Sequence, residues 1–202
     1  MAIAELREKI IRLGKTQKKF LDLGRDRNRM DDPKYADPNN IDDSGAITKD
    51  DALFLYDYVQ KHRPLNIWEF GTWFGTSAYI MAQAVRDIGA EYATVRTCDK
   101  HDVFVSLTDF EESVKYYHMH STDFLKRLIS RKCHLVFADA TLKAGDAELI
   151  TAAFDGPVRF ITHDYYGQAK GLGNIAKMKA ACKGKRMKLS VEGQMAIYEE
   201  TE

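Results

Sequence analysis

The sequence has no excess of charge of one sign and no long apolar run, and each absence argues against a class of protein. Its 202 residues include 30 Lys and Arg against 30 Asp and Glu. A protein that coats nucleic acid or an anionic membrane normally carries a basic excess, so neither partner is expected. No stretch approaches the roughly 18 consecutive apolar residues of a membrane span. The N-terminus also lacks the apolar segment of a signal peptide.

Cysteine is scarce as well. The three cysteines, Cys98, Cys133 and Cys182, are odd in number, far apart and in no CxxC pair. This usage is typical of reduced thiols and disfavours a disulfide framework or a structural zinc site. We therefore expect a cytoplasmic protein.

What the chain does contain is enough apolar residues for one globular core, 45% by composition. Residues 1–47 differ from the rest. Apolar residues at three- and four-residue steps predict an amphipathic helix over 3–23, and the proline- and aspartate-rich segment 25–47 predicts a long loop. The helix could pack on its own domain, serve as a lid or form a homo-oligomer contact. We expect a main domain over 48–202.

From Thr48 onward, short apolar runs alternate with helical segments. Thr48 and Asp51 have the spacing of a helix N-terminal capping box. Strands are predicted at 65–70, 93–98, 114–119, 134–138, 158–162, 187–191 and 195–199, and helices at 48–63, 76–88, from about 107, 122–131, 144–153 and 174–182. This alternation predicts an α/β fold with a doubly wound, mostly parallel seven-stranded sheet. The last two strands flank a very short turn, so the sheet should end in an antiparallel hairpin.

Ligands of such sheets bind beyond the carboxyl ends of the strands. The first strand runs into EFGTWFGTS (69–77), a glycine turn that leads directly into a helix. Neither the GxGxxG of a dinucleotide loop nor the GxxxxGK[ST] of a P-loop is present, which disfavours a pyrophosphate site. The carboxylate of Glu69 suits a cationic or amino group, although an ordinary βα turn could have the same sequence.

Polar residues also follow the other strands. Asp99, at the end of the second strand, is suited to accept both hydroxyls of a ribose. Asp139 follows the fourth strand, and His163 and Asp164 follow the fifth. These three side chains should face one crevice, where they could form a hydrogen-bonded network or bind Mg²⁺ or Mn²⁺.

The segment EFGTWFGTSAYIMA (69–82) resembles the E-x-G-x-x-x-G-x-S-A cofactor loop of class I S-adenosylmethionine-dependent methyltransferases. The resemblance extends over residues 48–200 and is greatest to the catechol-type, macrocin-type and cephalosporin-hydroxylase-like O-methyltransferases. It implies a Rossmann-like methyltransferase fold that binds S-adenosylmethionine. The predicted terminal hairpin also matches this fold.

The resemblance assigns roles to particular residues. Glu69, Gly71 and Gly75 would border the amino acid end of the cofactor, Asp99 the ribose, and Ser121 and Thr122 the adenine. The rest of the implied cofactor site is Thr72, Thr76, Ser77, Lys100 and Asp139. Asp139, His163 and Asp164 would be metal ligands, with His163 where the group usually has an acidic residue. A histidine often found three residues after the fourth-strand aspartate is replaced here by Leu142.

The sequence thus predicts methyl transfer to the hydroxyl of a small molecule, a sugar or a phenol, assisted by Mg²⁺ or Mn²⁺. Lys143 and His163 are the candidate catalytic bases. Two alternatives remain open: an NAD-type oxidoreductase, which the glycine pattern disfavours, and a catalytically inactive cofactor-binding or scaffold domain.

Overall fold

The computed structural model describes residues 2–17, 37, 39–41, 44–90, 92–166 and 169–201. The strands are β1 (Asn66–Phe70), β2 (Thr94–Asp99), β3 (Val114–His118), β4 (Leu135–Ala138), β5 (Arg159–Thr162), β6 (Met187–Glu192) and β7 (Met195–Glu200). The helices are α1 (Ile3–Thr16), α4 (Lys49–His62), α5 (Thr76–Asp87), α6 (Ser121–Leu128), α7 (Asp146–Ala153), α8 (Ala169–Ala181) and the 3₁₀ turn η1 (Thr108–Phe110).

The strands form one seven-stranded sheet in the order β3-β2-β1-β4-β5-β7-β6. Strands β1 to β5 pair in parallel, and β7 pairs antiparallel with both β5 and β6. The doubly wound sheet with a terminal hairpin is therefore confirmed. The strand order reverses between β1 and β4, and their carboxyl ends mark the place where such folds bind ligands.

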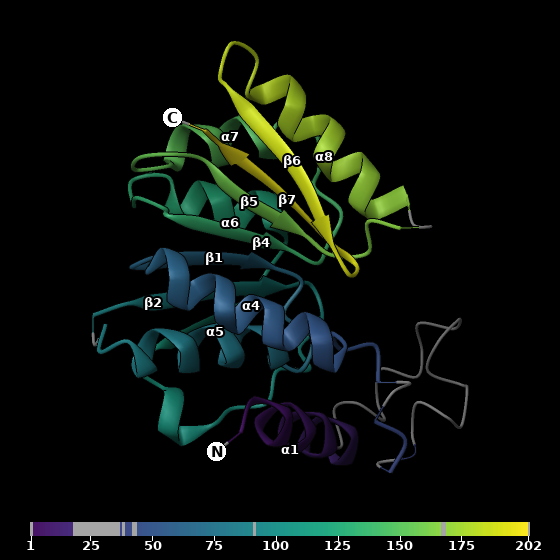
Figure 1. Cartoon of the computed structure of the whole chain (residues 1–202). Helices are drawn as coiled ribbons and strands as arrows, with labels where there is room; N and C mark the ends of the chain where they lie inside the picture. The colour runs from purple at the N-terminus through teal and green to yellow at the C-terminus, as the bar shows by residue number, and fades with distance from the viewer. Residues whose placement is uncertain are drawn as a thin grey trace.

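Helices cover both faces of the sheet (Figure 1). Side chains alternate along a strand, so Ile67 of β1 joins the core formed with α1, α4 and α5, while Trp68 and Phe70 join the core formed with α6, α7 and α8. All four of the last residues of β1 are buried. A central strand buried on both faces reads as a continuous apolar run, and this makes Glu69 in the same strand exceptional.

Helix α1 packs on its own domain, as one of the three sequence interpretations proposed. Its apolar residues Ile3, Leu6 and Ile10 are buried in the core shared with α4 and α5, and Ile11 is also fully buried. Gly14 lies against the ring of Phe74, so close that a Cβ there would be 2.4 Å from Cγ. The predicted end of this helix near residue 23, and most of the 25–47 loop, lie outside the described residues.

Two helix predictions need correction. The helix expected from about residue 107 is only the three-residue turn η1. The helix expected from 174 begins five residues earlier, at Ala169, so Gly171 and Gly173 lie inside α8 and not before it. Glycine lowers helix propensity by about 1 kcal/mol per residue, which is why the sequence indicated a later start.

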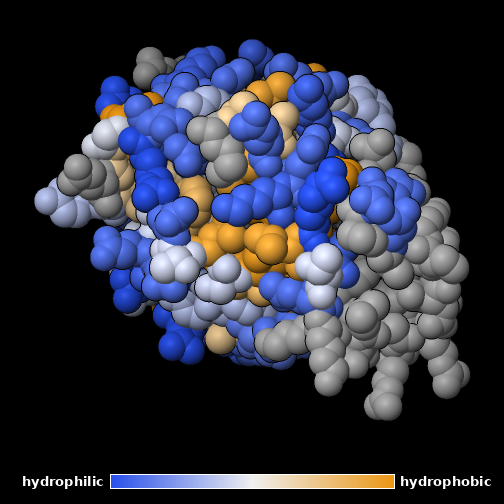
Figure 2. Space-filling view, turned by 90° about the horizontal axis from the view of Figure 1, so that it is seen from below, coloured by the Kyte–Doolittle hydropathy of each residue, from blue (hydrophilic) through white to orange (hydrophobic). Residues whose placement is uncertain are grey.

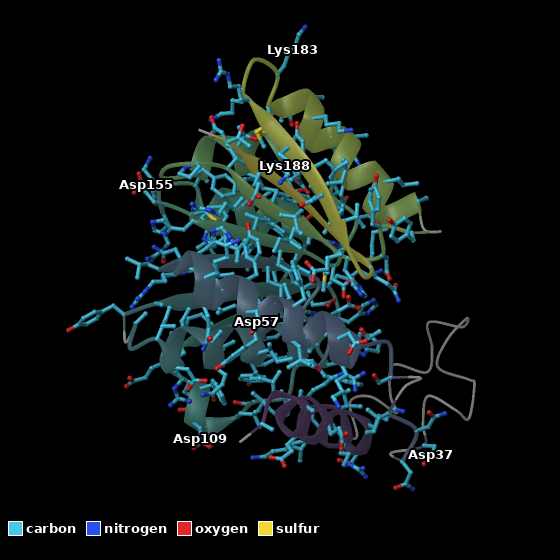
Figure 3. All side chains as sticks on the ribbon, viewed as in Figure 1. Asp37, Asp57, Asp109, Asp155, Lys183 and Lys188 are labelled. Carbon is cyan, nitrogen blue, oxygen red and sulfur yellow. The ribbon has the colours of Figure 1, made fainter. Side chains whose placement is uncertain are left out.

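Exposed charged side chains cover the periphery. Asp109, Asp155 and Lys183 point outward from the edges of the ribbon, and Asp57 and Lys188 lie on exposed faces of α4 and β6 (Figure 3). Within the described part of the chain, no helix combines the length and the apolar character needed to cross a bilayer.

Candidate active site

The residues predicted at the strand ends come together where β1, β4 and β5 end. Phe70 pairs with Ala138, and Ala138 pairs with Thr162, so the next residue of each strand reaches the same edge. Asp139 N–H donates to Phe70 O at 2.8 Å and His163 N–H to Ala138 O at 3.1 Å. Gly71, Asp139 and His163 are therefore adjacent because of the register of the sheet.

The glycine loop requires its two glycines for different reasons. Both have left-handed backbones, with φ +92° at Gly71 and +94° at Gly75. A Cβ on Gly71 would lie 2.8 Å from the Asp139 carbonyl carbon, whereas one on Gly75 would meet the ring of Phe104 at 2.7 Å. Gly71 thus lets two strand ends approach backbone to backbone, and Gly75 makes room for an aromatic ring.

Trp73 lies between these glycines and is itself left-handed, with φ +47°. Its backbone N–H donates to Asp99 Oδ2 at 2.9 Å, and its indole Nε1–H donates to Ser44 O at 3.0 Å. These two bonds hold a conformation that an L-residue rarely adopts. The loop is consequently tied both to the end of β2 and to the segment that precedes α4.

A small pocket opens beside the loop. It is lined by three groups of residues: a turn before α4, the glycine loop with the first turn of α5, and the end of β4, namely Gly45, Ala46, Ile47, Gly71, Thr72, Trp73, Thr76, Ser77 and Asp139. Five of the predicted cofactor residues are in this set. The contribution of residues 45–47 was not anticipated, since the sequence assigned them to a long loop without a defined position.

Glu69 lies behind the pocket wall and is fully buried. Its Oε1 accepts a hydrogen bond from Ser77 Oγ, which lines the pocket. Its Oε2 has no partner, and neither has Thr76 Oγ1. Burial raises the pKa of Glu69 to about 8, against hydrogen bonds from Ser77 and Thr97 that lower it. Two unpartnered polar oxygens next to an open pocket fit a ligand that brings hydrogen-bonding groups of its own.

Asp99 and Lys100 lie at the end of β2. Each carboxylate oxygen of Asp99 accepts one backbone hydrogen bond, Oδ2 from Trp73 and Oδ1 from His101 at 2.9 Å. The carboxylate is half-buried and oriented by the loop, while Lys100 is exposed. Neither lines the pocket beside Gly71, and their assignment to the ribose remains a prediction.

Ser121 and Thr122 are the first two residues of α6, and His120 is the N-cap residue. Their hydroxyls donate to Asp146 Oδ2 and Oδ1 at 2.8 and 2.9 Å. Asp146 is fully buried and also accepts the backbone N–H of Lys143 at 2.8 Å. Both residues thus join α6 to α7, and their predicted contact with adenine remains untested.

A cluster of charged side chains occupies the ends of β4 and β5. His163 Nδ1 lies 3.2 Å from Asp139 Oδ1 and 3.4 Å from Asp164 Oδ1. His163 Nε2 lies 3.3 Å from Asp51 Oδ2 of α4. Lys170 of α8 forms ion pairs with Asp139 Oδ1 and, at 2.6 Å, with Asp164 Oδ2. The hydrogen-bonded network, one of the two arrangements expected at these strand ends, is therefore present in the structure.

The charge state of His163 follows from these neighbours. Burial by itself lowers its pKa, but hydrogen bonds and charge from Asp139, Asp51 and Asp164 raise it to about 9. At neutral pH the ring is then an imidazolium, which has no free lone pair for a proton. The cluster thus favours His163 as a cation that joins three carboxylates, and its role as a catalytic base remains a prediction without geometric support.

The three predicted metal ligands do lie together, since one ligand atom from each of Asp139, His163 and Asp164 falls within 4.8 Å of the others. The donor set nevertheless fits a divalent ion poorly. Metal-bound histidine must offer a lone pair, whereas both ring nitrogens here face carboxylate oxygens, which only accept. The carboxylate oxygens are in turn bound by the Lys170 ammonium.

The other predicted base, Lys143, lies on the loop after β4, and its side chain is exposed. Leu142 beside it is buried, and its backbone N–H donates to Asn174 Oδ1 at 2.9 Å. The loop is thus anchored, but among the described residues no contact joins the Lys143 amine to the charged cluster. The catalytic role of Lys143 stays a prediction.

Sequence reasoning missed two residues of the cluster. Asp51 was assigned only to the cap of α4, which it does form: its N–H donates to Thr48 Oγ1 at 3.2 Å. Its burial, with the side chain only 4% exposed, was not foreseen. Lys170 precedes residue 174, where the helix was expected to begin, and so was assigned to no element. One signal was available, since Lys170 and Asn174 are four residues apart and so share a helix face.

Comparison with known proteins now places the fold. The chain has the Rossmann-like fold of class I methyltransferases, with a glycine loop after β1 and acidic residues after β2 and β4. Residues 68–165 match the family model described as a methyltransferase domain. These findings confirm the resemblance to the class I S-adenosylmethionine-dependent methyltransferases. A search of curated proteins finds no match.

Solved structures with this fold include three methyltransferases at low identity. An O-methyltransferase from Bacillus cereus in complex with S-adenosylhomocysteine is 15% identical, with TM-score 0.61 over 78% of this chain and 83% of that one. A methyltransferase from Podospora anserina, also bound to S-adenosylhomocysteine, is 14% identical, with TM-score 0.63 over 91% and 86%. The O-methyltransferase TomG from Streptomyces achromogenes, in complex with S-adenosylmethionine, is 15% identical, with TM-score 0.56 over 78% and 82%.

Proposed function

We propose that this chain is an O-methyltransferase that uses S-adenosylmethionine to methylate a hydroxyl group of a small molecule. One observation carries the proposal: the pocket beside the glycine loop has Asp139 in its wall, and Asp139 also belongs to the charged cluster at the ends of β4 and β5. A donor bound at the loop and an acceptor at the cluster would therefore be adjacent. The methyltransferase domain match supports this reading over the NAD-type alternative.

The pocket suits the amino acid end of the donor. The unpartnered Oγ1 of Thr76 lines the pocket and can accept a hydrogen bond from an ammonium group. Gly71 lets backbone approach the ligand without a side chain between them. When bound, S-adenosylmethionine supplies a methyl group on a positively charged sulfur. Asp139 in the wall of the pocket favours that positive charge.

The acceptor side is built by the cluster and the residues after it. Asp164 is held in a left-handed conformation, φ +57°, and Tyr165 and Tyr166 follow it with their rings 5.5 Å apart. Tyr166 is 65% exposed, so an aromatic wall is available to an acceptor such as a phenol or a sugar. The chain's task is to align the acceptor oxygen with the methyl carbon and sulfur. Lys143, exposed on the loop after β4, is the proposed base, and it would accept the hydroxyl proton only in its neutral amine form.

The donor site can be tested without knowing the acceptor. We expect calorimetric titration to show S-adenosylhomocysteine binding to the wild-type protein, with at least about a tenfold weaker affinity in Gly71→Ala. Gly156→Ala is a matched control, because Gly156 has the same φ of +92° but open space around its Cβ position. Both variants have the strain of a left-handed alanine, and only Gly71→Ala pushes against Asp139.

Methyl transfer itself is tested with a panel of candidate acceptors. We expect transfer of label from methyl-labelled S-adenosylmethionine to at least one sugar or phenol, with loss of label transfer in Gly71→Ala and retention in Gly156→Ala. Failure of the wild type to bind S-adenosylhomocysteine would contradict the proposal. Binding without transfer to any member of a broad panel would instead favour the inactive cofactor-binding alternative.

A homo-oligomer contact through α1 is the remaining proposal about partners. The face that carries α1 shows apolar side chains in its middle, surrounded by charged ones (Figure 2). Leu13 of α1 is 38% exposed, although most of the apolar stripe of the helix is buried in its own domain. Light scattering across a concentration series tests this, and a monomer at all concentrations would exclude it.

A further inference from the structure

We propose that the ammonium group of Lys170 is the permanent cation of this acceptor site, in the place where a divalent metal was predicted, and that the protein works without a metal there. The role of Lys170 in methyl transfer rests on the proposed function. Its assignment as the cation of the cluster is independent of that function. It rests on the contacts of Lys170, on the anchoring of α8 and on the carboxylate oxygens that face both ring nitrogens of His163.

The three N–H donors of the Lys170 ammonium face three oxygen acceptors. It binds Asp139 Oδ1, Asp139 O at 2.9 Å and Asp164 Oδ2 at 2.6 Å. An ammonium group donates three hydrogen bonds, so its capacity is filled by the two residues that a metal would bridge. Its side chain is only 19% exposed. A divalent ion would have to break all three contacts and push a positive charge toward solvent.

Helix α8 is built to hold Lys170 in this position. Asn174, one turn further along and fully buried, donates through Nδ2 to Ala140 O at 2.9 Å and to Thr162 Oγ1 at 3.1 Å. It thereby fixes the helix to the ends of both β4 and β5. A Cβ on Gly171 would lie 2.7 Å from Asp164 O, so only glycine lets the first turn of α8 come this close to the acidic strand end.

His163 supports the same conclusion from the other side. Its two ring nitrogens face carboxylate oxygens of Asp139 and Asp164 on one side and Asp51 on the other. Because these oxygens accept and do not donate, each nitrogen is occupied by a proton, and neither offers a lone pair to a metal. Three carboxylates with two internal cations leave one negative charge next to the pocket, which complements a positively charged sulfur.

The assignment makes Lys170 a positioning residue. Its ammonium orients the carboxylates of Asp139 and Asp164 toward the pocket and the acceptor side and neutralises part of their repulsion. A lysine that serves only to stabilise the fold would not control metal binding. Removing this one charge should create the metal site that the sequence pattern predicted, since Asp139 and Asp164 would then lack their cation.

The test is a titration of Mn²⁺ alone, followed by the paramagnetic resonance signal of free Mn²⁺. We expect no bound ion in the wild type or in Lys170→Arg. Lys179→Met, which replaces an exposed lysine of the same helix, is the control and should also bind no ion. We expect Lys170→Met to bind one Mn²⁺ per chain and to lose it again when Asp164→Asn is added. Circular dichroism and S-adenosylhomocysteine titration on the same samples show whether each variant is folded.

Two results would overturn the inference. One is that the wild-type protein binds one Mn²⁺ and that Asp164→Asn abolishes this binding. This comparison remains informative even if Lys170→Met does not fold. The other is folded Lys170→Met that gains no Mn²⁺. Failure of the proposed function is separate, because it would appear as absent S-adenosylhomocysteine binding while the metal titrations still give their answer.

Discussion

At the scale of the residue, the site concentrates conformations and ionisations that are uncommon elsewhere in the chain. Trp73 and Asp164 are two of three non-glycine residues with positive φ in the described structure. Both flank the region where donor and acceptor are proposed to meet. Left-handed residues of this kind persist only where surrounding contacts hold them, and they cluster at binding sites. Glu69, a buried carboxyl in a central strand, is the corresponding electrostatic feature.

Glu69 should make the stability of the unliganded protein depend on pH. Its carboxyl ionises near pH 4.5 in the unfolded chain and near pH 8 in the folded one, because it is buried. Between these values the folded state holds more protons, so the free energy of unfolding falls as pH rises, by at most about 1.4 kcal/mol per pH unit. The melting temperature should fall with the free energy of unfolding, and Glu69→Gln should weaken this fall between pH 5 and 8.

The control for that comparison is Glu148→Gln, which removes an exposed carboxyl of α7. Its melting curve should follow the wild type at every pH. Since other buried groups also titrate, the informative quantity is the difference between wild type and Glu69→Gln. Parallel profiles for these two proteins would mean that Glu69 is ionised in the folded state at neutral pH.

At the scale of the element, α1 supports the glycine loop from behind. Gly14 receives the ring of Phe74, which belongs to the loop and is fully buried. Arg7 Nε donates to Ile47 O at 2.6 Å, and residue 47 lines the pocket. The N-terminal helix therefore contacts both walls of the proposed donor site. This connection predicts that a segment outside the methyltransferase domain match, residues 68–165, contributes to binding.

Gly14→Ala tests this support. Helix propensity alone favours alanine by about 1 kcal/mol, but the new Cβ would lie 2.4 Å from the ring of Phe74. Overpacking typically costs about 1–3 kcal/mol, so we expect a net loss in the free energy of unfolding and weaker S-adenosylhomocysteine binding. Chemical denaturation and calorimetry measure both, with the exposed Lys9→Ala as control. A stabilised Gly14→Ala would show that α1 and the loop move apart freely.

At the scale of the whole molecule, α4, the first helix of the main domain, meets the terminal hairpin of β6 and β7 at the site. Asp51 of α4 contacts His163 after β5 and lies 3.4 Å, Oδ1 to backbone N, from Gln194 in the turn between β6 and β7. Tyr165 N–H donates to the carbonyl of the same Gln194 at 3.1 Å. Three segments far apart in the chain thus close one edge of the sheet around the charged cluster.

Asp51→Asn should therefore destabilise the whole domain. The substitution removes a buried charge that faces an imidazolium, and the loss of a hydrogen bond to a charged group costs about 1.5–3 kcal/mol. Its neighbour Asp50 is exposed in the same helical turn, so Asp50→Asn is a matched control. Urea denaturation should give a lower midpoint for Asp51→Asn with an unchanged slope. Equal midpoints for the two variants would exclude a linking role for Asp51.

Much of the fold and part of the site followed from local pattern. Alternating apolar runs and helical segments predicted the seven-stranded sheet, and the parallel strands that they imply end at one edge. Asp139, His163 and Asp164 were expected there for this reason, and the register of β1, β4 and β5 brings them together. The Thr48 cap and the terminal hairpin were also predicted correctly, because both depend on residues adjacent in sequence.

The sequence by itself thus determined the fold class, the glycine loop and the acidic strand ends, since each depends on periodicity or on neighbouring residues. Only the tertiary structure decided what neutralises those acids. Lys170 reaches Asp139 across about 30 residues, and Asp51 reaches His163 across about 110. Both pairings are set by how α8 and α4 pack on the sheet. Charge compensation depends on distance in space, and no local pattern in the chain encodes that distance.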